Sequence, residues 1–188
     1  MRRLLLLLAV TMPLAAASGA GDAQHRSAAF RSLAVEVSPA CCSIGFTAYA
    51  FGIFPIEGQF ARFAGSLVVE PGSLHAEARI EAASLMLDGG PIEADVKSDS
   101  FLDVAHYGAI TFRADGTGTG PAAATDADTL HGVLTIRGVT RPVVLTIRRN
   151  EAWVTAEARI SRSAWGITAR PFLAGDTVAI RVVAPLPN

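Results

Sequence analysis

Residues 154–161 read Val-Thr-Ala-Glu-Ala-Arg-Ile-Ser, and apolar and polar side chains alternate at every step. The same two-residue period recurs in residues 76–82, 110–115 and 143–148. Successive side chains of a β-strand point to opposite faces, so strict alternation is typical of antiparallel strands with one buried and one solvated face. These stretches therefore predict an antiparallel sheet that buries one face.

Turn-forming residues separate these stretches from further predicted strands, at residues 33–37, 43–51, 64–70, 130–137 and 177–184. One stretch departs from the strand pattern, because it has a proline near its start, acidic residues early and a lysine at its end. This arrangement favours a short helix near residues 91–97. We therefore predict an all-β fold, an antiparallel barrel or sandwich of about eight strands with one short helix.

The N-terminus has the features of a secretory signal. It reads Met-Arg-Arg-Leu-Leu-Leu-Leu-Leu-Ala-Val, and small residues follow the apolar run. Such a run is too short to span a bilayer. We expect residues 1–20 to be a signal peptide, cleaved after Ala17 or Ala20. Residues 21–32 are then a flexible lead-in, and residues 33–188 form one β-barrel domain in the periplasm.

The charge and hydropathy of the chain exclude some classes of partner. The formal net charge is −1, so no excess of positive charge favours nucleic acid or an anionic membrane surface. After the signal, no segment offers about 20 consecutive apolar residues. We therefore expect neither a nucleic-acid partner nor a membrane-spanning helix in the mature protein.

The two cysteines, Cys41 and Cys42, are adjacent in the sequence. Neighbours on an extended strand point to opposite faces, so a bridge between them needs a strained ring. We expect two free thiols, with Cys42 as a small core residue and Cys41 on the other face. The alternative is an intermolecular bridge or a redox role for Cys41.

The predicted inner face combines large apolar side chains with unusually small ones. The small residues are Ala48, Ala50, Ala78, Ala82, Gly132, Ala156 and Ala158. A filled barrel of about eight strands needs bulk at such positions, and empty apolar volume costs about 24 cal/mol per Å³. Two interpretations stay open: the small residues match a taper of the barrel, or they surround a cavity that an apolar ligand fills.

Five motifs in order resemble those of the YceI-like family. They are residues 37–46, residues 58–65, residues 98–112, residues 131–143 and residues 161–167. Gly-Gln-Phe opens the second motif, Ser-Asp-Ser-Phe-Leu-Asp-Val opens the third, and Ser-Arg-Ser-Ala-Trp-Gly-Ile forms the fifth. The set is much more specific than any one motif, because it spans nearly the whole mature chain.

The resemblance implies an exported, lipocalin-like barrel that sequesters an isoprenoid lipid, either a polyprenyl chain or a quinone tail. It favours the cavity interpretation of the small inner residues. We expect the ligand-binding residues of the lumen to be Ile44, Phe46, Phe60, Ile80, Phe112, Leu134, Ile136, Leu145, Ile160, Trp165 and Ile180.

The sequence departs from the family pattern at three places. Cys41 stands where the family often has histidine, residues 92–96 replace an Arg-Asp-x-His-Leu pattern, and Gly108 replaces a usual proline. Two polar positions that could contact a ligand head group are therefore altered. The identity of the head group is not carried over from the family.

The sequence shows no catalytic or metal-binding constellation. His25, His75, His106 and His131 are scattered without ligand spacing, and no serine has a nucleophile motif. We therefore expect a binding protein and neither an enzyme nor a cofactor. The alternative is an accessory protein for a membrane redox partner such as a cytochrome, or for a stress response, with lipid incidental. We expect Arg162 and Trp165 to close the barrel near its mouth, or Arg162 to pair with a carboxylate or a ligand head.

Overall fold

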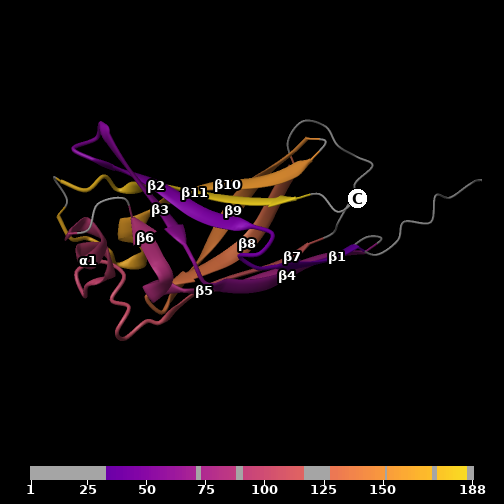
Figure 1. The fold of residues 1–188 in the computed structure, drawn as a ribbon, viewed down its shortest axis with the longest axis horizontal. Coiled ribbons are helices and arrows are strands. Elements are labelled where there is room, and N and C mark those ends of the chain that lie inside the picture. The colour runs from indigo at the N-terminus through magenta and orange to yellow at the C-terminus, as the bar shows by residue number, and fades with distance from the viewer. Residues whose placement is uncertain are drawn as a thin grey trace, which may run out of the picture.

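One antiparallel sheet of eleven strands forms the fold in a computed structural model (Figure 1). The model describes residues 33–70, 73–87, 91–116, 128–150, 152–170 and 173–185, so the predicted signal and lead-in lie outside the described residues. The strands are β1 (Leu33–Val37), β2 (Ser43–Ala50), β3 (Phe54–Phe60), β4 (Phe63–Glu70), β5 (Ser73–Glu81), β6 (Leu85–Leu87), β7 (Ala109–Gly116), β8 (Asp128–Ile136), β9 (Val139–Arg149), β10 (Trp153–Ser161) and β11 (Thr177–Pro185). The predicted all-β class is confirmed.

The sheet curls strongly into a half-barrel. Its strand order is β1-β4-β5-β7-β8-β9-β10-β11-β2-β3-β6, and every neighbouring pair is antiparallel. In Figure 1, β2, β3, β10 and β11 form one wall and β4, β5 and β7 form the opposite wall. The inward side chains of both walls make one hydrophobic core.

The sheet exceeds the predicted count of about eight because two strands, β3 and β6, occur in addition to the nine stretches that the sequence predicts. The strand β3 contains Pro55 and Gly58, which normally disfavour strand interiors. Proline is tolerated here because β6 pairs only with residues 58–60, so Pro55 has a strand neighbour on one side. The strand β6 has three residues, too few to show a period.

A hydrogen-bonded seam joins the two walls where the chain crosses between them. The β3–β4 connection and the short 3-10 turn Ala82–Ser84 lie side by side at this seam. The Arg62 N–H donates to the buried Ser84 Oγ at 3.0 Å, and Ser84 Oγ donates to the Glu81 carbonyl at 2.7 Å. The Arg62 guanidinium binds the Glu81 carboxylate through two hydrogen bonds, of 2.6 and 2.8 Å. The seam closes the curl without strand pairing.

The helix α1 spans Pro91–Lys97, as predicted, and lies at the end of the barrel where β11 begins (Figure 1). Glu93 accepts a hydrogen bond from the Leu87 N–H at 3.0 Å and one from Lys97 Nζ at 2.6 Å. The helix is thereby fixed to the edge of β6. Within the described residues, no helix is long and apolar enough to cross a membrane.

The connection between β1 and β2 is a tight turn, which corrects the expected geometry of the cysteines. The backbone N–H groups of Cys41 and Cys42 both donate to the Ser38 carbonyl, at 3.2 and 3.0 Å. A turn does not alternate side chains as a strand does, so the two Sγ atoms lie on one side, 2.6 Å apart. Both are free thiols in this structure, and both are half-buried.

Candidate functional site

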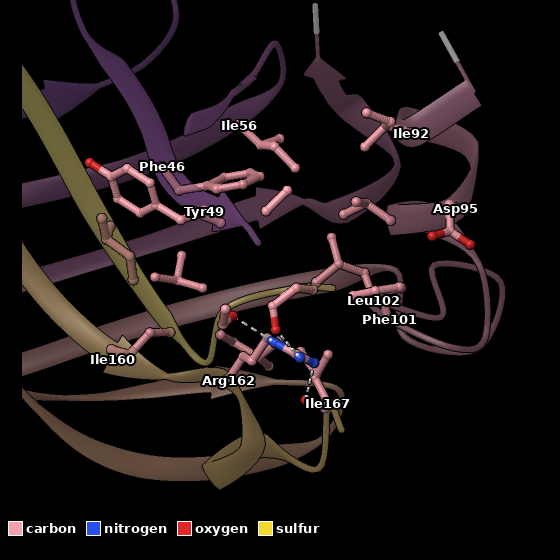
Figure 2. Close-up of a pocket in the computed structure, with 18 of the residues that line it drawn as sticks. Phe46, Tyr49, Ile56, Ile92, Asp95, Phe101, Leu102, Ile160, Arg162 and Ile167 are labelled. Carbon is pink, nitrogen blue, oxygen red and sulfur yellow. Dashed lines mark hydrogen bonds between the residues drawn. The ribbon is translucent and has the colours of Figure 1, made fainter. Parts of the chain in front are cut away.

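An apolar cavity of ≈ 300 Å³ occupies the half of the barrel next to α1. Inward side chains of β2, β3, β5, β7, β8, β10 and β11 form its walls, and residues of α1 and of two loops border its opening (Figure 2). These loops are residues 98–108, after α1, and, before β11, residues 162–170 and 173–176. The cavity is therefore open at one end of the barrel.

Eight of the eleven predicted lumen residues line this cavity. They are Ile44, Phe46, Phe60, Ile80, Leu134, Ile136, Ile160 and Ile180. Two of the eight are phenylalanines and the other six are aliphatic, so the walls offer hydrocarbon with few polar atoms.

The other three predicted residues, Phe112, Leu145 and Trp165, belong to the core but do not line the cavity. The ring of Phe112 packs over Gly132, where a Cβ would lie 2.6 Å from it, so the ring fills the gap that the glycine leaves. The Trp165 indole is buried and donates its Nε1–H to the Leu134 carbonyl at 3.1 Å. Trp165 therefore braces the wall and does not close the mouth.

The two interpretations of the small inner residues, a cavity and a barrel filled by the protein itself, apply at different ends of the barrel. Ala48 and Ala50 line the cavity. Toward the far end, Ala158 of the predicted set is buried in packed protein and leaves no lining surface, and so are Ala76 on β5 and Ala114 on β7, which the predicted set did not include. The far half is therefore filled by the protein itself.

Four apolar residues at the opening were not predicted from the sequence. Phe101 and Leu102 line the cavity from the loop after α1, and Ile92 and Val96 do so from α1 itself. Phe101 and Leu102 stand inside the third family motif, which was the available signal. The residues of α1 gave no such signal, because the family pattern is lost there.

The rim of the opening exposes large apolar side chains. The β2–β3 hairpin presents Phe51, Ile53 and Phe54, with 63%, 70% and 59% of their surface exposed. Ile92 on α1 and Leu173 in the loop before β11 are exposed as well. Contiguous exposed apolar groups beside a cavity mark a binding region.

Arg162 is the buried charged group at this site. Its guanidinium donates to the carbonyls of Gly175, Ile167 and Ala174, at 3.0, 2.7 and 2.7 Å (Figure 2). The cation also lies 5.7 Å from the ring centroid of Phe101. Among the described residues no carboxylate forms an ion pair with it, so the expected carboxylate partner is not found. Arg162 thereby ties Ile167 to Ala174 and Gly175 within the loop before β11.

The remaining charges at the opening are paired with each other. Asp95 of α1 accepts a hydrogen bond from Arg170 at 2.7 Å, which ties α1 to the loop before β11. Glu93 and Asp95 thus bind different partners, so they do not form an acid–base pair. Across the described parts of the chain, no cluster of three or more potential metal ligands occurs.

A curled antiparallel sheet around an apolar cavity defines the class of lipocalin-like barrels. The chain belongs to the YceI-like family, since the YceI-like domain matches residues 35–186. No curated protein sequence matches the chain.

Solved structures share this fold at low sequence identity. BcnA of Burkholderia cenocepacia is similar at 23% identity, with a TM-score of 0.67 over 80% of this chain and 99% of that one. A polyisoprenoid-binding domain from Saccharophagus degradans, implicated in plant cell wall breakdown, is 13% identical, with a TM-score of 0.59 over 84% and 100% of the two chains. The YceI protein of Campylobacter jejuni is 18% identical, with a TM-score of 0.56 over 70% and 85%.

Proposed function

We propose that this protein binds the apolar tail of an isoprenoid lipid, a polyprenyl chain or a quinone tail, in the cavity beside α1. It would sequester or carry this lipid in the periplasm, the compartment to which the predicted N-terminal signal would direct it. The observation that carries the proposal is the open cavity of ≈ 300 Å³ with an almost wholly apolar lining. The similar domain from Saccharophagus degradans, described as polyisoprenoid-binding, supports the same ligand class.

Burial of hydrocarbon is the energy source for such binding. Each buried methylene contributes about 0.8 kcal/mol, whereas one head-group hydrogen bond contributes about 1 kcal/mol. A tail with several buried carbons therefore outweighs the head group. A binding role, without catalysis, also agrees with Glu93 and Asp95, whose carboxylates are engaged by Lys97 and Arg170.

The size of the cavity limits how much of a tail it encloses. A volume of ≈ 300 Å³ stands at the lower end of the range for ligand pockets, about 300–1,000 Å³. A long polyprenyl chain would therefore extend through the opening and lie along Phe51, Phe54 and the other exposed rim residues. Affinity should rise steeply with tail length until the cavity is full, less steeply while further carbons lie along the rim, and level off beyond the rim.

Native mass spectrometry and organic extraction of the purified protein test this proposal. We expect a co-purifying isoprenoid, and competition by quinones whose affinity rises with tail length and then levels off. Equal affinity for short and long tails would contradict the proposal. A protein free of lipid that captures a membrane cytochrome would favour the accessory role, and turnover of a polyprenyl substrate would indicate an enzyme.

A further inference from the structure

The turn between β1 and β2 places two sulfur atoms in contact, at the end of the barrel away from α1. The Sγ atoms of Cys41 and Cys42 are 2.6 Å apart, closer than the van der Waals contact of two sulfur atoms. The Cys41 Sγ also lies 3.3 Å from the Glu36 carbonyl and 3.4 Å from the Ser38 carbonyl. The turn thus holds both sulfur atoms on one side and close enough to react with each other.

The pair is open to a reagent. Both cysteines border a shallow depression that Asn150, Trp153 and Arg181 also line. The Trp153 side chain is exposed there. A small molecule in this depression can therefore reach the sulfur atoms without any opening of the barrel.

We propose that Cys41 and Cys42 form a redox-active vicinal pair that exchanges with a disulfide compound, with Cys41 as the attacking thiol and Cys42 as the resolving thiol. The Cys41 thiolate attacks one sulfur of the disulfide, forms a mixed disulfide and releases the first thiolate. Cys42 then attacks the Cys41 Sγ and releases the second thiolate, and the two leaving groups take up the protons of the cysteines. Two cysteine thiols are oxidised to one disulfide, and the disulfide compound is reduced to two thiols.

The environment of each sulfur supports this division of roles. A hydrogen bond from the Cys42 thiol lowers the pKa of Cys41 below its ordinary value, whereas burial raises the pKa of Cys42 to about 11. Adjacent cysteines have Cα atoms about 3.8 Å apart, closer than in ordinary disulfides. The ring formed between them is strained and easily reduced, as is typical of exchangeable disulfides.

Oxidised glutathione tests the proposal on the purified, reduced protein. We expect the intact mass to fall by two hydrogen atoms, both thiols to resist alkylation, and the chain to stay monomeric on a non-reducing gel. A reducing agent should restore both thiols. A disulfide-linked dimer, a lasting glutathione adduct on the unmodified sequence, or two thiols that stay reactive would each overturn the proposal.

The single variants test the two roles. The Cys42→Ser variant should keep one glutathione on Cys41, because the resolving thiol is missing. The Cys41→Ser variant should react with oxidised glutathione about tenfold more slowly than the Cys42→Ser variant does. The raised pKa of Cys42 lowers its thiolate fraction by more than it raises the nucleophilicity of the thiolate. Equal rates for the two variants would overturn the assignment. As a control for folding, the unfolding curve of each single variant should match that of the Cys41→Ser, Cys42→Ser double variant.

Discussion

Filling the cavity should separate ligand binding from stability, and Ala48→Phe is the substitution that tests this. Ala48 lies on β2 and lines the cavity. An empty apolar cavity of ≈ 300 Å³ costs at most about 7 kcal/mol at about 24 cal/mol per Å³. A phenyl ring in this space should therefore stabilise the ligand-free protein, by about 0.5–2 kcal/mol for a typical cavity-filling substitution.

The same ring should weaken binding strongly. It displaces about six carbons of the tail, and at about 0.8 kcal/mol per methylene the loss is about 5 kcal/mol. Since about 1.4 kcal/mol is a factor of ten, affinity should fall about a thousandfold. Ala64→Phe, at an exposed position on β4, is the matched control and should bind as the unmodified protein does. Quinone titration and urea unfolding measure both effects, and a folded Ala48→Phe protein that still binds would refute the placement of the ligand.

Three further substitutions test the supports of the site. Arg162→Met should destabilise the protein by about 2–4 kcal/mol, because three carbonyls lose their donor; an unchanged urea midpoint would contradict this. Ser84→Ala should cost about 1–3 kcal/mol, since the backbone N–H of Arg62 loses its acceptor at the seam, and hydrogen exchange of that amide should speed up. Hydrogen bonds from the Ser161 hydroxyl and from a backbone N–H hold the pKa of Asp176 below its ordinary value of 3.8. The ionised carboxylate therefore stabilises the fold above that pH, and this contribution is lost as the pH falls through the lowered pKa. The Asp176→Asn variant should be less stable than the unmodified protein at neutral pH, and this difference in stability should shrink in acid. A difference that persists at low pH would argue against a stabilising role of the ionised carboxylate.

The parts of the fold that the sequence predicts are those with a regular period. The strand at residues 154–161 and the helix at residues 91–97 follow from local chemistry, because alternation and first-turn proline act over a few residues. The strand β3 does not follow, because Pro55 is acceptable only where its neighbour β6 is too short to reach it. Such tolerance depends on a partner distant in the sequence.

The candidate site shows the same division between local and distant effects. Periodicity alone predicts that Ile44 and Ile160 point inward, and the structure places both on the cavity wall. How far the cavity extends depends on packing between strands, since the ring of Phe112 on β7 fills the gap over Gly132 on the neighbouring strand β8. No pattern within one strand reports what the neighbouring strand supplies. The contact between the two cysteine sulfur atoms was not predicted for a related reason, because the chain makes a turn where an extended strand was assumed.

The two end strands of the curled sheet bear on how this protein behaves in a crowded compartment. Unpaired strand edges are templates on which other chains add and aggregate. Here both end strands are short, with five residues in β1 and three in β6, and the part of β3 that β6 leaves uncovered contains Pro55, which has no backbone N–H to donate to another strand. Each also has one backbone group engaged by a side chain of its own molecule, the Leu87 N–H by Glu93 and the Glu36 carbonyl by the Cys41 thiol. These features disfavour the addition of further chains at the edges of a half-barrel that never completes its ring of strands.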